Sequence, residues 1–158
     1  RIMAYLPQHV GNVLQEAAIN INALTKGMIV RMRYKKLDGK SKEYWIIVLQ
    51  PKWKGPTDKN YLIHALNLDV LPTSDLFRLA EETGIIGSKS LWADRRLDIE
   101  KLQLDMSSRR FYNSNLKNVK ALGSAYRTYL FNNVVSVRVC DYNFGTSFED
   151  IVDLGIED

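Results

Sequence analysis

Apolar and polar residues alternate along residues 28–36, which read MIVRMRYKK. This alternation predicts a β-strand in which Val30, Met32 and Tyr34 share one face. The opposite face carries three cations: Arg31, Arg33 and Lys35. We therefore expect one face of this strand to be buried and the other to be hydrated and basic.

Two further strand-like segments follow, at residues 43–50 (EYWIIVLQ) and 61–71 (YLIHALNLDVL). Asp38 and Gly39 lie between the first two segments and predict a tight hairpin. Residues 43–50 are almost continuously apolar, which is typical of a central strand that is covered on both faces. The connection at residues 51–60 has the composition of a loop.

Strand-like patterns return near the end of the chain, at residues 126–131 (YRTYLF) and 134–142 (VVSVRVCDY). Asn132 and Asn133 lie between them. Because asparagine tolerates positive φ, a tight turn and a second hairpin are predicted here.

Helical patterns occur before and between these strands. Residues 8–25 have apolar residues at the spacing of an amphipathic helix. Residues 73–122 are predicted to be a mainly helical insertion. Within it we expect one helix that stops at Gly84, a second over residues 96–104, and a third over residues 107–121.

These elements together predict an α+β protein whose 158 residues form a single domain. Its β core, residues 27–72 and 124–142, is expected to be a small antiparallel SH3-like half-open β-barrel of about five strands. The N-terminal helix precedes this core, and the helical insertion lies between strands three and four. Residues 146–158 form an acidic tail.

Charge is unevenly distributed along the chain. The formal net charge is +4, yet five of the last ten residues are acidic: Glu149, Asp150, Asp153, Glu157 and Asp158. A basic body with an acidic tail suggests an acidic partner, a self-association contact or pairing of the tail with the body. A solvated tail without a role is an equally good interpretation. No apolar run approaches the ~20 residues of a membrane helix, so no membrane association is predicted.

The residues that carry catalytic chemistry are sparse. His9 and His64 lie far apart in the sequence, and no metal-ligand, nucleophile or phosphate-binding motif is present. We therefore predict no catalytic residue, metal, cofactor or small-molecule substrate. His64 is interpreted as a core histidine, with a general base as the alternative. Asp69 and Asp141 end two strands and could hold a divalent ion as in some nucleases, although turn capping is the simpler interpretation.

Two binding hypotheses remain. Tyrosine, tryptophan and arginine anchor many protein interfaces, which nominates an interface set: Trp53, Trp92, Tyr126, Arg127 and Tyr129. Cations neutralise phosphates and exposed rings stack on unpaired bases, which nominates a nucleic-acid set: Arg31, Arg33, Lys35, Lys52 and Lys54. The simpler alternatives are rings in the core and a solvated basic face.

Three segments also resemble a little-characterised family of small β-domain proteins from large tailed bacteriophages. The segments are YKKLDGKSKEYWIIVLQPKWKG, YLIHALNLDVLP and SAYRTYLFNNVVSVRVCDY. The matching positions are Pro51, Leu62, His64, Ala65, Leu66, Asn67, Leu68, Tyr126, Arg127, Thr128 and Tyr129. Ile63, between Leu62 and His64, departs from the family pattern.

This resemblance covers residues 27–72 and 124–142 and supplies no catalytic residue. It implies a non-enzymatic virion or assembly component that docks to other virion proteins in a multi-copy assembly, in the tail, neck or baseplate. The expected location is the virion, and the host cytoplasm during assembly. The alternative function is a nucleic-acid-binding accessory protein, with DNA as partner and the basic hairpin as its binding face.

Overall fold

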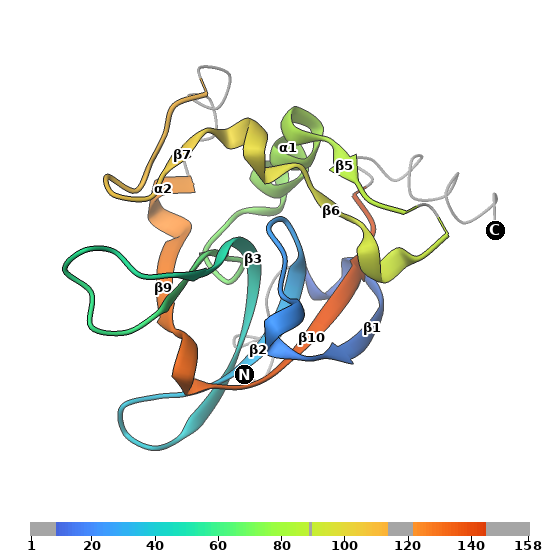
Figure 1. Cartoon of the computed structure of the whole chain (residues 1–158). Helices are drawn as coiled ribbons and strands as arrows, with labels where there is room; N and C mark the ends of the chain where they lie inside the picture. The colour runs from blue at the N-terminus through green and yellow to red at the C-terminus, as the bar shows by residue number, and fades with distance from the viewer. Residues whose placement is uncertain (1–8, 89, 114–121, 145–158) are drawn as a thin grey trace.

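A computed structural model describes residues 9–88, 90–113 and 122–144. Its main element is a six-stranded antiparallel sheet with the order β1-β10-β2-β3-β4-β9 (Figure 1). The strands are β1 (Val13–Ile19), β2 (Ile29–Lys35), β3 (Ser41–Trp53), β4 (Leu62–Asn67), β9 (Tyr126–Leu130) and β10 (Val134–Tyr142). The five strands predicted from the sequence are thus present, and β1 is an additional one.

The remaining elements are short. Two small sheets pair β5 (Ile85–Ile86) with β6 (Arg96–Leu97) and β7 (Leu104–Asp105) with β8 (Arg110–Phe111). The α-helices are α1 (Thr73–Thr83) and α2 (Leu122–Ala125). Five 3₁₀ turns are described: Val10–Asn12, Ile21–Ala23, Trp92–Asp94, Ile99–Leu102 and Phe131–Asn133.

The β2–β3 hairpin forms where the sequence predicts it. Gly39 has a φ of 82°, a backbone conformation that glycine adopts without strain. The Asp38 carboxylate accepts a hydrogen bond of 2.8 Å from the backbone N–H of Lys40, which fixes the turn locally. The prediction that the following strand is central is also confirmed, because Ile46, Ile47, Val48 and Leu49 of β3 are all buried.

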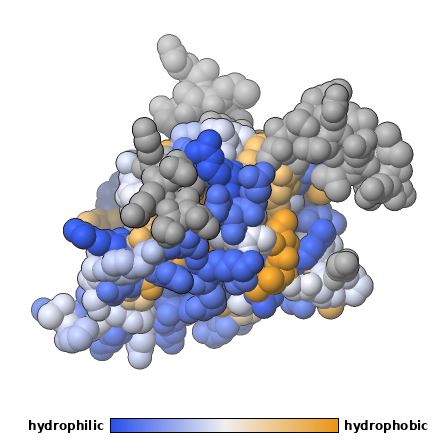
Figure 2. All heavy atoms as spheres, turned by 90° about the horizontal axis from the view of Figure 1, so that it is seen from above, coloured by the Kyte–Doolittle hydropathy of each residue, from blue (hydrophilic) through white to orange (hydrophobic). Residues whose placement is uncertain are grey.

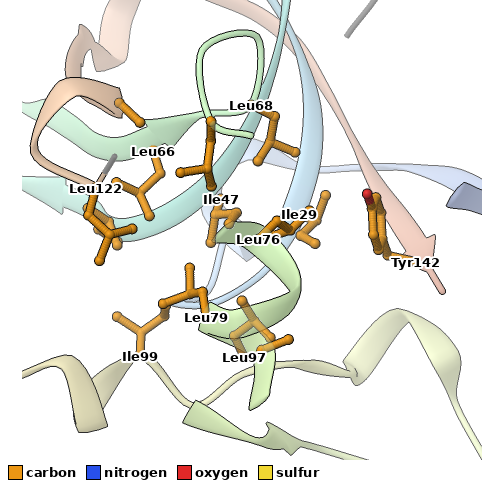
Figure 3. Packing of buried hydrophobic residues seen from close by; sticks show 14 of the residues in the cluster. Ile29, Ile47, Leu66, Leu68, Leu76, Leu79, Leu97, Ile99, Leu122 and Tyr142 are labelled. Atoms are coloured by element: carbon orange, nitrogen blue, oxygen red, sulfur yellow. The ribbon is translucent and has the colours of Figure 1, made fainter. Parts of the chain in front are cut away.

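Alternate residues of the central strands supply two hydrophobic cores, one on each face of the sheet. On one face, Ile47 of β3 and Leu66 of β4 pack in the same cluster as Leu76 and Leu79 of α1 (Figure 3). On the other face, Val30, Met32, Ile46, Val48, Ile63, Val137 and Val139 form a second cluster. Full burial of each such side chain contributes roughly 1.5–3 kcal/mol, so both faces of the central strands stabilise the fold.

The predicted N-terminal helix over residues 8–25 is wrong. Residues Val13–Ile19 form β1, which pairs with β10, and 3₁₀ turns precede and follow it. The apolar spacing that suggested a helix would have buried Leu14, whose side chain is 64% exposed next to a register shift in β1. Pairing with β10 overrides the local pattern here.

The predicted helical insertion over residues 73–122 is also wrong as a whole. Its first helix exists as α1 and stops at Gly84. The second expected helix is replaced by β6, the 3₁₀ turn Ile99–Leu102 and β7, and the described part of the third, residues 107–113, contains β8. Residues 114–121 lie outside the described residues.

The predicted half-open SH3-like barrel of about five strands is wrong. The main element is instead the open six-stranded sheet described above. The described residues show no pairing that closes β1 onto β9. The predicted second hairpin is also wrong, because β9 and β10 do not pair with each other. β9 pairs with β4, whereas β10 pairs with β1 and β2. The 3₁₀ turn Phe131–Asn133 redirects the chain between them.

Candidate interaction surface

Residues from both binding hypotheses meet where β3, β4 and β9 lie side by side. Lys52, Trp53 and Lys54 lie at the end of β3, and Trp53 pairs with Leu62 of β4, which pairs with Leu130 of β9. This end of the sheet therefore combines two lysines of the nucleic-acid set with Trp53 of the interface set.

The two lysines contact one exposed and one half-buried aromatic ring. The Lys52 ammonium lies 4.7 Å from the ring centre of Tyr61 and 4.8 Å from that of Phe131. The Lys54 ammonium lies 5.7 Å from the Tyr61 ring centre, and Tyr61 is 46% exposed. Each contact of this kind contributes about 0.5–1 kcal/mol at an exposed site. We name these four residues (Lys52, Lys54, Tyr61 and Phe131) the cationic–aromatic end.

Strand pairing and the loop set this geometry. The Phe131 N–H donates a 3.0 Å hydrogen bond to the Tyr61 carbonyl, which extends the β4–β9 pairing and brings the two rings to one side. In the loop, the Gly55 N–H donates to the Asp58 carboxylate at 2.9 Å. Asp58 is thus held within its own loop, and no ion pair of Lys52 or Lys54 occurs among the described residues.

A second aromatic group lies on the opposite side of β4. His64 is completely buried, with its ring edge-on to Trp53 and Tyr126 at centroid distances of 5.4 and 5.6 Å. Its Nδ1 is hydrogen-bonded to the Tyr126 hydroxyl at 2.5 Å, and its Nε2 is buried without a hydrogen-bond partner. Phe111 of β8 packs on Tyr126. Trp53 and Tyr126 of the interface set therefore meet around a histidine.

Burial controls the protonation of this group. Desolvation, with the nearby Arg109 charge as a smaller cause, lowers the pKa of His64 to about 4. Desolvation also raises the pKa of Tyr126 to about 12. Both groups are neutral at pH 7. The His64 ring is inaccessible to a substrate, and with its lowered pKa it is a weak base. The core interpretation therefore fits His64, and the general-base alternative does not.

The other interface residues lie in different surroundings. Tyr129 is buried against Tyr34 and Tyr44, and its hydroxyl accepts a hydrogen bond of 3.2 Å from Asn67. Burial raises the pKa of Tyr129. Arg127 is exposed, and its guanidinium donates to the carbonyls of Ser124 and Tyr126. The ring of Tyr129 thus belongs to the core, while Arg127 is accessible.

Trp92 lies apart from the β3–β4–β9 end. Its 3₁₀ turn contacts β10, and its ring lines a small pocket together with Arg95, Asp141 and Phe144. The five nominated interface residues consequently do not form one continuous surface.

The nucleic-acid set is divided as well. Arg33 and Lys35 are exposed on β2, next to the start of β3, whereas Lys52 and Lys54 lie at its other end (Figure 1). Arg31 is engaged by carboxylates, since it forms ion pairs with Glu16 of β1 and, at 3.2 Å, with Glu43 of β3. Its charge is therefore compensated.

The two aspartates considered for a metal have separate neighbours. Asp141 accepts hydrogen bonds of 3.1 Å from both Arg95 and Gln15. Asp69 follows β4, where its N–H donates to Asn67 in a turn, and desolvation raises the pKa of its carboxyl. No group of three possible metal-ligating residues is found in the part of the chain that the structure describes.

The sequence did not single out Tyr61 or Phe131. Their proximity follows from pairing between β4 and β9, which are distant in the chain. The available signal was the location of Tyr61 directly after the loop that carries Lys52 and Lys54.

Comparison with protein-family models, curated proteins and solved structures finds no match to this chain. Among the described residues, no helix combines the length and apolar character needed to cross a membrane. The interpretation of function therefore depends on the surface chemistry described above.

Proposed function

We propose that this protein is a non-enzymatic docking component that binds an acidic surface of another protein through the cationic–aromatic end. The observation that carries the proposal is the position of Lys52 and Lys54 against the exposed ring of Tyr61, without an ion pair among the described residues. An exposed ring beside two uncompensated cations offers apolar area and charge complementarity to carboxylates.

The resemblance to the phage family supports a virion as the place where this docking occurs. In that setting the protein is a component of a tailed-phage virion, in its tail, neck or baseplate, and contacts other virion proteins in a multi-copy assembly. Arg127 lies on β9, four residues before Phe131, and adds an exposed cation farther along the same strand.

The test is incorporation into particles. The protein should copurify with virions through a density gradient, and the double variant Lys52→Ala/Lys54→Ala should be depleted from them at least about tenfold, the ratio that corresponds to 1.4 kcal/mol. The matched control, Lys36→Ala/Lys40→Ala, removes the same charge from the exposed β2–β3 turn and should be incorporated normally. Equal incorporation of both variants, or no copurification at all, would refute the proposal.

Nucleic-acid binding is the second candidate, and the same contacts favour it. A ring flanked by lysines can stack on an unpaired base while the ammonium groups meet phosphates. Titration with a single-stranded and a double-stranded DNA oligonucleotide from ~50 to ~200 mM salt distinguishes this candidate, because phosphate contacts make affinity fall steeply with salt.

The variants in that titration locate the DNA site. Loss of binding in Lys52→Ala/Lys54→Ala, with Arg33→Ala/Lys35→Ala unaffected, would place DNA at the cationic–aromatic end. The reverse would place DNA on the hairpin predicted from the sequence. If the protein binds neither oligonucleotide at ~50 mM salt, this candidate is excluded.

A further inference from the structure

An exposed apolar surface lies at the β5–β6 hairpin, apart from the cationic–aromatic end. Ile85 and Ile86 of β5 are 47% and 41% exposed, and Leu91 after β5 is 62% exposed. Figure 2 shows a hydrophobic stripe between hydrophilic areas on the face seen from above, where α1 and β5 lie. We name Ile85, Ile86 and Leu91 the β5 surface. These three are the large exposed hydrophobic residues of the described part of residues 85–91, and exposed apolar residues that gather in one region commonly mark an interaction site.

The β5 surface is held firmly on the body of the protein. Ile86 pairs with Arg96 of β6, and the Leu97 N–H donates a 3.0 Å hydrogen bond to the Gly27 carbonyl. A Cβ at Gly27 would lie 1.9 Å from the Leu97 carbonyl oxygen, so the hairpin approaches the main sheet as closely as the backbone permits. A partner would therefore meet a preorganised surface.

Two arginines of the same hairpin border the β5 surface. The Arg95 guanidinium pairs with Asp141 at 3.1 Å and is still 44% exposed. The Arg96 Nη1 donates to the Asp94 carbonyl at 2.9 Å, and no ion pair of Arg96 occurs within the described residues. An occupant with both apolar and acidic side chains would complement this combination.

The chain carries such a segment directly after the pocket beside β5. Phe144 lines that pocket together with Ile85, Trp92, Arg95 and Arg96, and residues 145–158 follow Phe144. They contain five apolar residues: Phe148, Ile151, Val152, Leu154 and Ile156. They also contain the five acidic residues of the tail. Attachment at Phe144 gives this segment an effective concentration of order millimolar at the hairpin.

We propose that the C-terminal segment, residues 145–158 of this chain, docks on the β5 surface of the same molecule, with its carboxylates toward Arg95 and Arg96. The acidic tail then pairs with the body rather than with a second copy. This proposal is independent of the docking function, because it involves a different surface and none of the residues of the cationic–aromatic end.

Paramagnetic broadening in the full chain tests the proposal. A spin label is attached at Asp153→Cys; the buried Cys140, whose pKa burial raises to about 12, stays unlabelled. The label should broaden the methyl resonances of Ile85 and Ile86 several-fold more than those of Leu37, which is fully exposed in the distant β2–β3 turn. Arg96→Glu should reduce this broadening, whereas Lys40→Glu, an equal change of charge in that turn, should not.

Two results would overturn the proposal. One is broadening of Ile85 and Ile86 that does not exceed that of Leu37. The other comes from a mixture of spin-labelled chains of natural isotopic abundance with isotope-labelled chains that lack the spin label. Broadening that appears only in this mixture would show that the segment docks on a second copy. Loss of virion incorporation in the lysine variants affects neither result, so the two proposals fail separately.

Discussion

The buried His64 gives the protein a stability that depends on pH. Its pKa is about 4 in the folded chain, against about 6.5 for an unperturbed histidine. Because the folded state binds this proton less readily than the unfolded state does, stability falls as the pH drops from about 6.5 toward 4. This destabilisation by His64 is nearly absent at pH 7, and it levels off below the pKa of the folded state.

The size of the effect follows from the two pKa values. Linkage gives a loss of about 2 kcal/mol between pH 7 and pH 5, and about 3 kcal/mol by pH 4. The perturbation that isolates it is His64→Gln, because glutamine can still hydrogen-bond the Tyr126 hydroxyl but does not titrate. Other groups whose pKa values shift, among them His9 and Asp69, are common to both chains and cancel in the difference.

Urea unfolding at a series of pH values between 4 and 7 measures this difference. We expect the free energy of unfolding of the natural chain to fall by about 2 kcal/mol more than that of His64→Gln between pH 7 and pH 5. The overall destabilisation of the variant does not matter, since only the slopes with pH are compared. Parallel slopes, or an NMR titration that gives His64 an ordinary pKa, would refute the reasoning.

Three further predictions concern the core, the turns and the sheet edge. Cys140, with its pKa raised to about 12, should not react with a thiol reagent at pH 8 in the folded chain and should react fully in urea. Gly27→Ala should destabilise the protein about 2 kcal/mol more than Gly39→Ala in urea unfolding, because both have positive φ but only at Gly27 does an added Cβ meet backbone. Tyr34→Phe should cost about 1 kcal/mol in the same assay, because the Tyr34 hydroxyl accepts the N–H of Leu130 at 2.9 Å; an unchanged free energy would contradict this.

The sequence predicts the central strands well because their patterns are local. Val30 and Met32 alternate with cations, and burial of one face follows directly from that spacing. The β1 strand could not be predicted in this way. Its apolar residues also fit a helix, and only the distant β10 decides between the two structures. The predicted β9–β10 hairpin fails for the same reason, since β10 lies between β1 and β2.

The candidate sites show the same limit. Lys52, Trp53 and Lys54 are adjacent in the chain, so the sequence could nominate them. Phe131 completes the cationic–aromatic end only through strand pairing. Arg31 was assigned to a basic face, but its partner Glu16 belongs to the strand that the sequence presents as a helix. Local patterns thus identify exposed chemistry, while long-range pairing determines which charges stay uncompensated.

The edge of the sheet at β9 indicates how a partner would be bound at this end. In antiparallel pairing, the bond between Phe131 and Tyr61 implies that the N–H and C=O groups of Leu130, Thr128 and Tyr126 point away from β4. The Tyr34 hydroxyl takes the Leu130 N–H, and the Arg127 guanidinium takes the Tyr126 carbonyl. Two of these six backbone groups are thus engaged within the molecule, which interrupts the edge that an added strand would pair with. The docking proposed for the cationic–aromatic end relies on side chains rather than on strand addition, which is why substitution of Lys52 and Lys54 is the perturbation that tests it.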